Sequence, residues 1–210
     1  MYLLTILLLA AAVIQTRMGD LRRAIAIILG QSAVLALACA VVGAQSGQMH
    51  MYVAAALTAV IKVGLIPYAL YKVLPYLAEE REVPTREIVK ANMSTFLSLL
   101  SIIIAFALVA PVVPGAAQHE TLPASISLVL IGFVLIMTRS QAVMQIIGLI
   151  TMENGLYLLG LTIANGLPLI IELGIFFDVL VAVVVLVILT YRLKLSFLST
   201  DTSLLKKLKG

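Results

Sequence analysis

Four ionisable residues lie inside long apolar stretches of this 210-residue chain, and they are Lys62, Glu153, Glu172 and Asp178. A charged side chain at the centre of a membrane-spanning helix costs about 2.5–3.5 kcal/mol on insertion scales. Such residues face protein or water, and by default they mark ion or proton pathways. Lys62, Glu153 and Asp178 lie near the middle of their stretches, so we expect them to take part in proton transfer.

Glu172 lies only three residues into the last apolar stretch. An interfacial carboxylate in contact with water is therefore as good an interpretation as a functional one. Glu172 and Asp178 are six residues apart, which separates them by about 120° and about 9 Å on a helix. The two acids are not expected to pair directly, and Glu172 remains a candidate for proton transfer beside the three deeper residues.

Helical spacing places other side chains beside Glu153. Tyr157 and Gly160 follow it by four and seven residues and share its face. Gly160 and Gly148 could allow a close helix contact, because small residues let backbones approach. Asn154 lies about 100° away from Glu153, where it could form a hydrogen bond with a neighbouring helix.

Lys62 has two informative neighbours on its own stretch. Thr58 shares its helix face, and Pro67 follows five residues later. A proline removes one backbone N–H from the helix, which frees a carbonyl near Lys62 and can kink the helix. A tolerated transmembrane proline without any further role is an equally good interpretation.

The embedded charges do not balance, because one base and three acids leave a deficit of positive charge. Lys62 can neutralise only one acid, so the other acids must hold protons or pair with another chain. We therefore expect protons to load at Glu153 and Asp178, with the charge of Lys62 setting how readily they load.

The elements that carry these residues follow from composition. The chain is 62% hydrophobic and 11% charged, with a mean hydropathy of +1.16 and a net charge of +4. A soluble domain is closer to half apolar and a quarter charged. These values exclude a soluble globule, a disordered chain and a nucleic-acid binder, and they predict an all-α, polytopic membrane protein.

Seven apolar stretches are long enough to be considered as spans. They cover approximately residues 1–16, 24–43, 51–72, 94–113, 122–137, 142–164 and 169–190. All but one of the 14 Lys and Arg residues fall in the first, third and fifth loops or the C-terminal tail, and the exception is Lys62. This asymmetry predicts an outside N-terminus and a cytoplasmic C-terminus in a bacterial or archaeal cell membrane.

Other kinds of chemistry have little support in the sequence. Cys39 is a single cysteine within an apolar stretch, so it cannot form an internal disulfide or a metal cluster alone. His50 and His119 both lie in loops, and no phosphate-binding loop or nucleophile motif is present. We therefore expect the chain to bind no metal or cofactor and to perform no redox chemistry itself.

The C-terminal half has a recognisable order of features. The string IGLITMENGLYLLGL contains Glu153, IELGIFFDVLVAVVV contains Asp178, and the tail ends in TDTSLLKKLKG. The last three stretches resemble the three-helix K subunit of respiratory complex I and the C subunit of Mrp-type cation antiporters. The longer form, with additional N-terminal spans, resembles component E of hydrogenase 4. The resemblance is strongest from Gln141 to Gly210.

This resemblance implies site residues by position. Glu153 corresponds to the acid of the K subunit's second span. Asp178 best corresponds to the acid of its third span, with a side chain shorter by one methylene. Glu172 has no clear counterpart there. Lys62, followed by Pro67, resembles the lysine-bearing spans of antiporter-like subunits.

The resemblance also implies an assembly. It would be a formate hydrogenlyase-like complex in which a nickel–iron hydrogenase or related redox arm drives proton or sodium movement through the membrane arm. The expected partners are antiporter-like and connecting membrane subunits, that redox arm and membrane lipids. Two alternatives remain open: a subunit of an Mrp-type cation/proton antiporter, and a structural spacer whose charges only specify assembly.

The expected organisation has five parts. They are an N-terminal three-helix part (1–76), a cytoplasmic loop (77–93), a linking helix with an outer loop (94–121), a K-subunit-like three-helix part (122–191) and a basic cytoplasmic tail (192–210).

Overall fold

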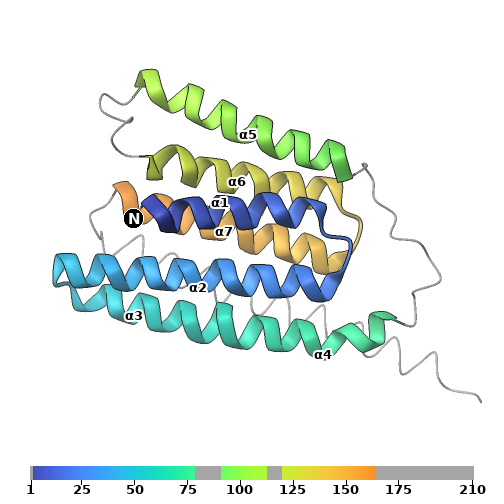
Figure 1. Ribbon diagram of the computed structural model, residues 1–210. Coiled ribbons are helices and arrows are strands. Elements are labelled where there is room, and N and C mark those ends of the chain that lie inside the picture. Colours follow the sequence, from blue (N-terminus) through green and yellow to red (C-terminus); the bar gives the residue numbers. More distant parts are fainter. Residues whose placement is uncertain (1, 79–90, 113–119, 164–210) are drawn as a thin grey trace, which may run out of the picture.

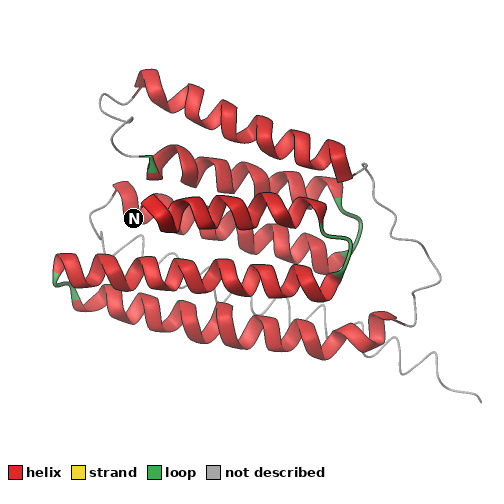
Figure 2. Cartoon of the chain, viewed as in Figure 1, coloured by secondary structure: helices red, strands yellow, loops and turns green. Residues whose placement is uncertain are grey.

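The computed structural model describes residues 2–78, 91–112 and 120–163, and these form helices joined by short turns (Figures 1 and 2). The helices are α1 (Tyr2–Arg17), α2 (Leu21–Ser46), α3 (Met49–Thr58), η1 (Ala59–Leu65), α4 (Ile66–Ala78), α5 (Ala91–Val112), α6 (Thr121–Thr138) and α7 (Ala142–Ile163). No β-strand occurs in these three ranges. The all-helical prediction is therefore confirmed for the part of the chain described.

Five helices are long and apolar enough to cross a membrane. They are Leu21–Ser46, Met49–Lys72, Ala91–Val109, Thr121–Thr138 and Ala142–Thr162. The first expected stretch, 1–16, forms the shorter apolar helix α1 of 16 residues. The seventh, 169–190, lies outside the described residues, so a multi-span protein is supported while the count of seven remains a prediction.

Local sequence signals define the ends of α2. Asp20 is the N-cap, and its carboxylate accepts a hydrogen bond from the backbone N–H of Arg22 at 2.9 Å. At the other end, Gly47 has φ of 68°, a left-handed conformation that glycine adopts without a steric penalty. Its N–H bonds to the carbonyl of Gly43, which ends the helix and turns the chain into α3.

The α6–α7 pair packs backbone against backbone. A Cβ atom added at Gly132 would lie 2.6 Å from the backbone nitrogen of Met152, and one at Gly155 would lie 2.7 Å from that of Val129. Gly148 is similarly close to α6, as its sequence position suggested. Gly132 and Gly155 were not expected. Three glycines therefore hold α7 at a fixed position against α6.

The helices form a bundle in which α1, α6 and α7 lie between α5 on one side and the α2–α3–α4 layer on the other (Figure 1). Hydrogen bonds at one end join helices that are not consecutive in the chain. The Tyr71 hydroxyl of α4 donates to the Arg22 carbonyl at 3.3 Å, and the hydroxyls of Thr16 and Thr95 are 3.1 Å apart. The C-terminus of α1 and the N-termini of α2 and α5 therefore share this end.

The basic residues of the described part gather at this end of the bundle, apart from Lys62 in the middle. They are Arg17, Arg22, Arg23, Lys72 and Arg139. Their common location agrees with the alternation of charge between loops.

Arg139, which the sequence assigns to the fifth loop, is not a solvated charge. It is 3% exposed, and its guanidinium donates a hydrogen bond to the Thr16 carbonyl in the last turn of α1. The last carbonyls of a helix lack partners within it, and a cation there also interacts favourably with the helix dipole. Arg139 therefore connects the turn between α6 and α7 with the C-terminal end of α1 by a hydrogen bond.

Candidate functional site

Lys62 lies on η1, a π-helical segment of seven residues between α3 and α4. The N–H of Ile66 bonds to the carbonyl of Ile61, five residues earlier, instead of four. Pro67 explains the change, because it has no N–H to bond the carbonyl of Val63 in the α-helical register. The sequence predicted a distortion near Pro67, and the structure shows that it is a wider turn, a feature often found at functional sites.

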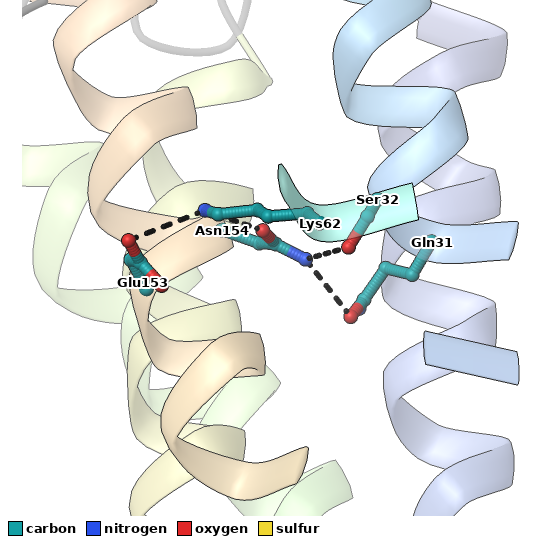
Figure 3. Close-up of polar contacts among 5 residues, drawn as sticks. All are labelled: Gln31, Ser32, Lys62, Glu153 and Asn154. Atoms are coloured by element: carbon teal, nitrogen blue, oxygen red, sulfur yellow. Dashed lines mark hydrogen bonds and ion pairs between the residues drawn. The ribbon is translucent and has the colours of Figure 1, made fainter. Parts of the chain in front are cut away.

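The wider turn directs the Lys62 side chain into the bundle, where it is fully buried. Its Nζ lies 3.5 Å from Oε1 of Glu153 and donates a hydrogen bond to Oδ1 of Asn154 at 3.1 Å (Figure 3). It also lies 5.6 Å from the ring centroid of Tyr157. The ammonium group is therefore held by a carboxylate, an amide oxygen and an aromatic face, all supplied by α7.

The Lys62–Glu153 contact is an ion pair largely removed from water. The carboxylate-bearing side chain is 4% exposed and that of the lysine 0%. Attraction between buried charges is strong, but removing both from water costs a comparable free energy. Such a pair is weak evidence for added stability. The pair can couple the charge states of its two members, because a change of charge on one side chain strongly changes the electrostatic energy of the other.

An amide network continues from the pair toward α2. The Nδ2 of Asn154 donates to Oε1 of Gln31 and to Oγ of Ser32, both at 3.4 Å (Figure 3). The Nε2 of Gln31 donates to the Leu8 carbonyl of α1 at 3.0 Å. These side chains are buried. The position of Lys62 is thus linked through two amides to the backbone of α1.

Thr151, two residues before Glu153 and three before Asn154 on α7, adds a second connection. Its hydroxyl oxygen lies 3.0 Å from Oε1 of Gln15, 3.5 Å from Oε1 of Gln31 and 2.9 Å from the Ile147 carbonyl. A hydroxyl has one hydrogen, so it donates to one of these acceptors at a time. Three helices, α1, α2 and α7, therefore meet through polar side chains at this level.

Sequence reasoning missed four members of this network. They are Gln15, Gln31, Ser32 and Thr151. Each is uncharged and lies inside an apolar stretch, so a search for embedded charges passes over it. Asn154 was expected to bond a neighbouring helix, and its bonds to α2 confirm this. The signal that could have identified Gln15 and Gln31 is the presence of a glutamine within an apolar stretch.

Thr58 was expected on the face of Lys62. It is buried one turn before the lysine, and its hydroxyl has no hydrogen-bond partner in the part of the chain described. Gly160, expected beside Glu153 on α7, is also buried.

Two of the four candidate residues lie outside the described ranges, namely Glu172 and Asp178. The structure therefore brings Lys62 and Glu153 together and says nothing of the other two. Within residues 2–78, 91–112 and 120–163, no group of three or more His, Cys, Asp or Glu side chains could hold a metal ion.

Comparison with known proteins gives one informative relationship. No family model matches the chain, and no solved structure matches it. The uncharacterized protein Rv0085 of Mycobacterium tuberculosis is 30% identical over 206 residues, which cover 97% of this chain and 92% of the relative. Such similarity over nearly the whole of both chains shows common descent. The chain therefore belongs to the same family as the uncharacterized protein Rv0085.

Proposed function

We propose that the protein is a membrane subunit of a complex I-related oxidoreductase of the hydrogenase-4 or formate hydrogenlyase type, and that it helps form a hydrated, charged axis for proton or sodium translocation. The observation that carries the proposal is the buried Lys62–Glu153 pair, with the two groups 3.5 Å apart. Ionisable residues retained in membrane helices mark ion or proton pathways by default. The resemblance of the last three apolar stretches to the K subunit supports the same conclusion.

The protonation state of Glu153 is coupled to how strongly the Lys62 ammonium is held beside it. While Glu153 is ionised, its charge attracts the Lys62 ammonium, and Asn154 holds the same group by a hydrogen bond. When Glu153 takes up a proton, the Coulomb attraction is lost and the hydrogen bond to Asn154 remains. A change in charge at a neighbouring site can therefore load or unload Glu153 through Lys62.

The proposal extends to residues outside the described ranges. Asp178 would continue the axis from Glu153, and Glu172 would connect it with the outer surface. The remaining imbalance of charge would be met by antiporter-like or connecting subunits of the complex. The redox centres would lie in a nickel–iron hydrogenase or related arm, and this chain would bind no cofactor.

The proposed topology has seven spans in a bacterial or archaeal cell membrane, with the N-terminus outside and the C-terminus in the cytoplasm. The end of the bundle that bears Arg17, Arg22 and Arg23 would then face the cytoplasm, in agreement with the positive-inside rule. Residues 122–191 would form the K-subunit-like part.

The proposal is tested by measuring proton uptake in inverted membrane vesicles of the native host, driven by formate or hydrogen. Glu153→Gln keeps the side-chain shape and removes the titrating group, so we expect the complex to assemble while coupled proton uptake falls. Ser127→Ala is the matched control, because within the described ranges its buried hydroxyl bonds to its own helix, at the Pro123 carbonyl. Unchanged uptake in Glu153→Gln, with reductant oxidation intact, would contradict the proposal.

A spacer subunit is the second candidate, because the two buried charges also satisfy each other. In that case Glu153→Gln would leave coupled uptake unchanged, and Glu153→Ala would reduce the amount of assembled complex. The Mrp-type antiporter alternative predicts cation/proton exchange without any dependence on formate or hydrogen.

A further inference from the structure

We propose that Gln31 and Asn154 are positioning residues that hold the Lys62 ammonium against Glu153, so that the site consists of an ion pair together with two uncharged amides, Gln31 on α2 and Asn154 on α7. The function of this support in proton transfer rests on the function proposed above. The positioning itself is independent of that function.

The directions of the hydrogen bonds carry the inference. A primary amide presents one acceptor oxygen and two donor hydrogens on opposite branches. The Nδ2 of Asn154 donates to Gln31 and Ser32, so its Oδ1 is turned toward Lys62. If the Asn154 amide were reversed, donor hydrogens would face the ammonium group. The acceptors on α2 therefore set the orientation that makes Asn154 a partner for a cation.

Gln31 is oriented in the same way. Its Nε2 donates to the Leu8 carbonyl at 3.0 Å, which leaves Oε1 to face α7. That oxygen accepts from Asn154 and lies 3.5 Å from the Thr151 hydroxyl. Because a backbone carbonyl can only accept, the order of donors and acceptors from Leu8 through Gln31 and Asn154 to Lys62 has a single direction.

The geometry also separates this role from that of a proton carrier. Glutamine and asparagine side chains do not titrate in the ordinary pH range, and each amide in the series already donates to a fixed acceptor. The Lys62 Nζ is nearer to the Asn154 oxygen, at 3.1 Å, than to Glu153, at 3.5 Å. The amide therefore supports the cation when the charge on Glu153 changes.

The direct test measures the distance between Lys62 and Glu153 in the full-length chain in lipid bilayers. Solid-state NMR with ¹⁵N-lysine and ¹³C-glutamate detects the dipolar contact between Lys Nζ and the Glu carboxylate, and Glu153→Gln identifies the contribution of this pair. Gln31→Met keeps the side-chain length and removes both hydrogen-bonding groups, so we expect the contact to be lost. Gln145→Leu removes an amide of α7 outside the network and serves as the control, with the contact retained.

A contact retained in Gln31→Met would overturn the inference. If that variant fails to accumulate in membranes, Ser32→Ala replaces it, because it removes one of the two acceptors of Asn154 and leaves Gln31 in place. We then expect a partial loss of the contact, and an unchanged contact would overturn the inference equally.

A second measurement connects positioning with function. In vesicles, Gln31→Met should lower coupled proton uptake about tenfold or more, the usual range for a lost hydrogen bond in support of a charged group. In a Lys62→Met background the same substitution should have no further effect. An equal loss in both backgrounds would indicate a general structural role and contradict the inference. If Lys62→Met and Glu153→Gln themselves leave uptake intact, the proposed function fails, while the NMR result still decides the positioning.

Discussion

The two contact faces of α7 hold their neighbours in different ways. Toward α6, Gly148 and Gly155 bring the backbone of α7 close to the backbone of α6. Toward α2 and η1, Glu153 and Asn154 make their contacts through side chains with rotatable bonds. The first face fixes the helix in place, and the second presents groups that can change charge or partner. A membrane helix that carries a charged site benefits from both, because a rigid position makes small changes at the site effective.

The largest effect should come from filling the glycine contact. Gly155→Leu would place side-chain atoms where the Val129 nitrogen and the Ser125 carbonyl now lie, at 2.7 and 2.8 Å from the position of a Cβ. Backbone cannot move aside as a side-chain end can, so α6 and α7 must separate. We expect a loss of about 5 kcal/mol or more, comparable to the stability of a whole domain.

The measurement for Gly155→Leu is the amount of folded chain in membranes, by detergent extraction and size-exclusion chromatography. Gly30→Leu is the control, because a Cβ at Gly30 has no atom within 4 Å. Normal accumulation of Gly155→Leu would show that the α6–α7 face is less rigid than described.

The second effect concerns the ion pair. Lys62→Met should lower the free energy of unfolding by about 3 kcal/mol, because it leaves a buried carboxylate without its counter-charge. Adding Glu153→Gln should restore most of this loss, since no charge then remains in the site. Thermal unfolding in detergent, measured over the full double-mutant cycle, checks the prediction. Additive losses would mean that the two groups do not interact.

The third effect belongs to Arg139. Arg139→Met should lower the free energy of unfolding by about 1–3 kcal/mol, because the Thr16 carbonyl loses a charged donor. Arg23→Met is the comparison: Arg23 forms an exposed pair with Asp20 at 3.6 Å, and such pairs contribute about 0–1 kcal/mol. Equal effects of the two substitutions, measured by the same unfolding assay, would show that burial of Arg139 contributes nothing.

The smallest effect should come from the edge of the amide network. Thr151→Val removes a hydroxyl that has Gln15 and its own helix as acceptors, and we expect a loss of about 1 kcal/mol. Thr162→Val removes a hydroxyl that, among the residues the structure describes, bonds to the Leu158 carbonyl of its own helix, and it should have less effect. The unfolding midpoints of the two variants should differ in that order, and the reverse order would argue against a connected network.

The helices and the embedded charges of Lys62 and Glu153 could be predicted from the sequence for a physical reason. Hydropathy adds over some twenty residues, so each apolar stretch is a strong signal, and a lone charge within it is conspicuous. We expected Lys62 and Glu153 to share one polar axis, but not their direct contact, because the two residues are 91 positions apart and their register depends on how the helices pack. Gln31 has no charge, so a search for embedded charges passed over it, although a glutamine within an apolar stretch is itself unusual.

The π-helical segment and Arg139 show two further limits. A proline predicts that the regular helix is disturbed, but a kink and a wider turn both accommodate Pro67, so the residue type alone does not distinguish between them. For Arg139 the sequence indicated a loop position, but nothing local indicated that the Thr16 carbonyl lies beside it.

Infrared difference spectroscopy of the assembled complex during turnover tests the central claim most directly. If Glu153 loads and unloads a proton under the influence of Lys62, the spectrum contains a carboxyl C=O band that is absent in Glu153→Gln and displaced in Lys62→Met. A turnover spectrum in which the carboxyl region is identical in the wild type and in Glu153→Gln would show that Glu153 does not change its protonation state, and the account of this site as part of a proton pathway would be wrong.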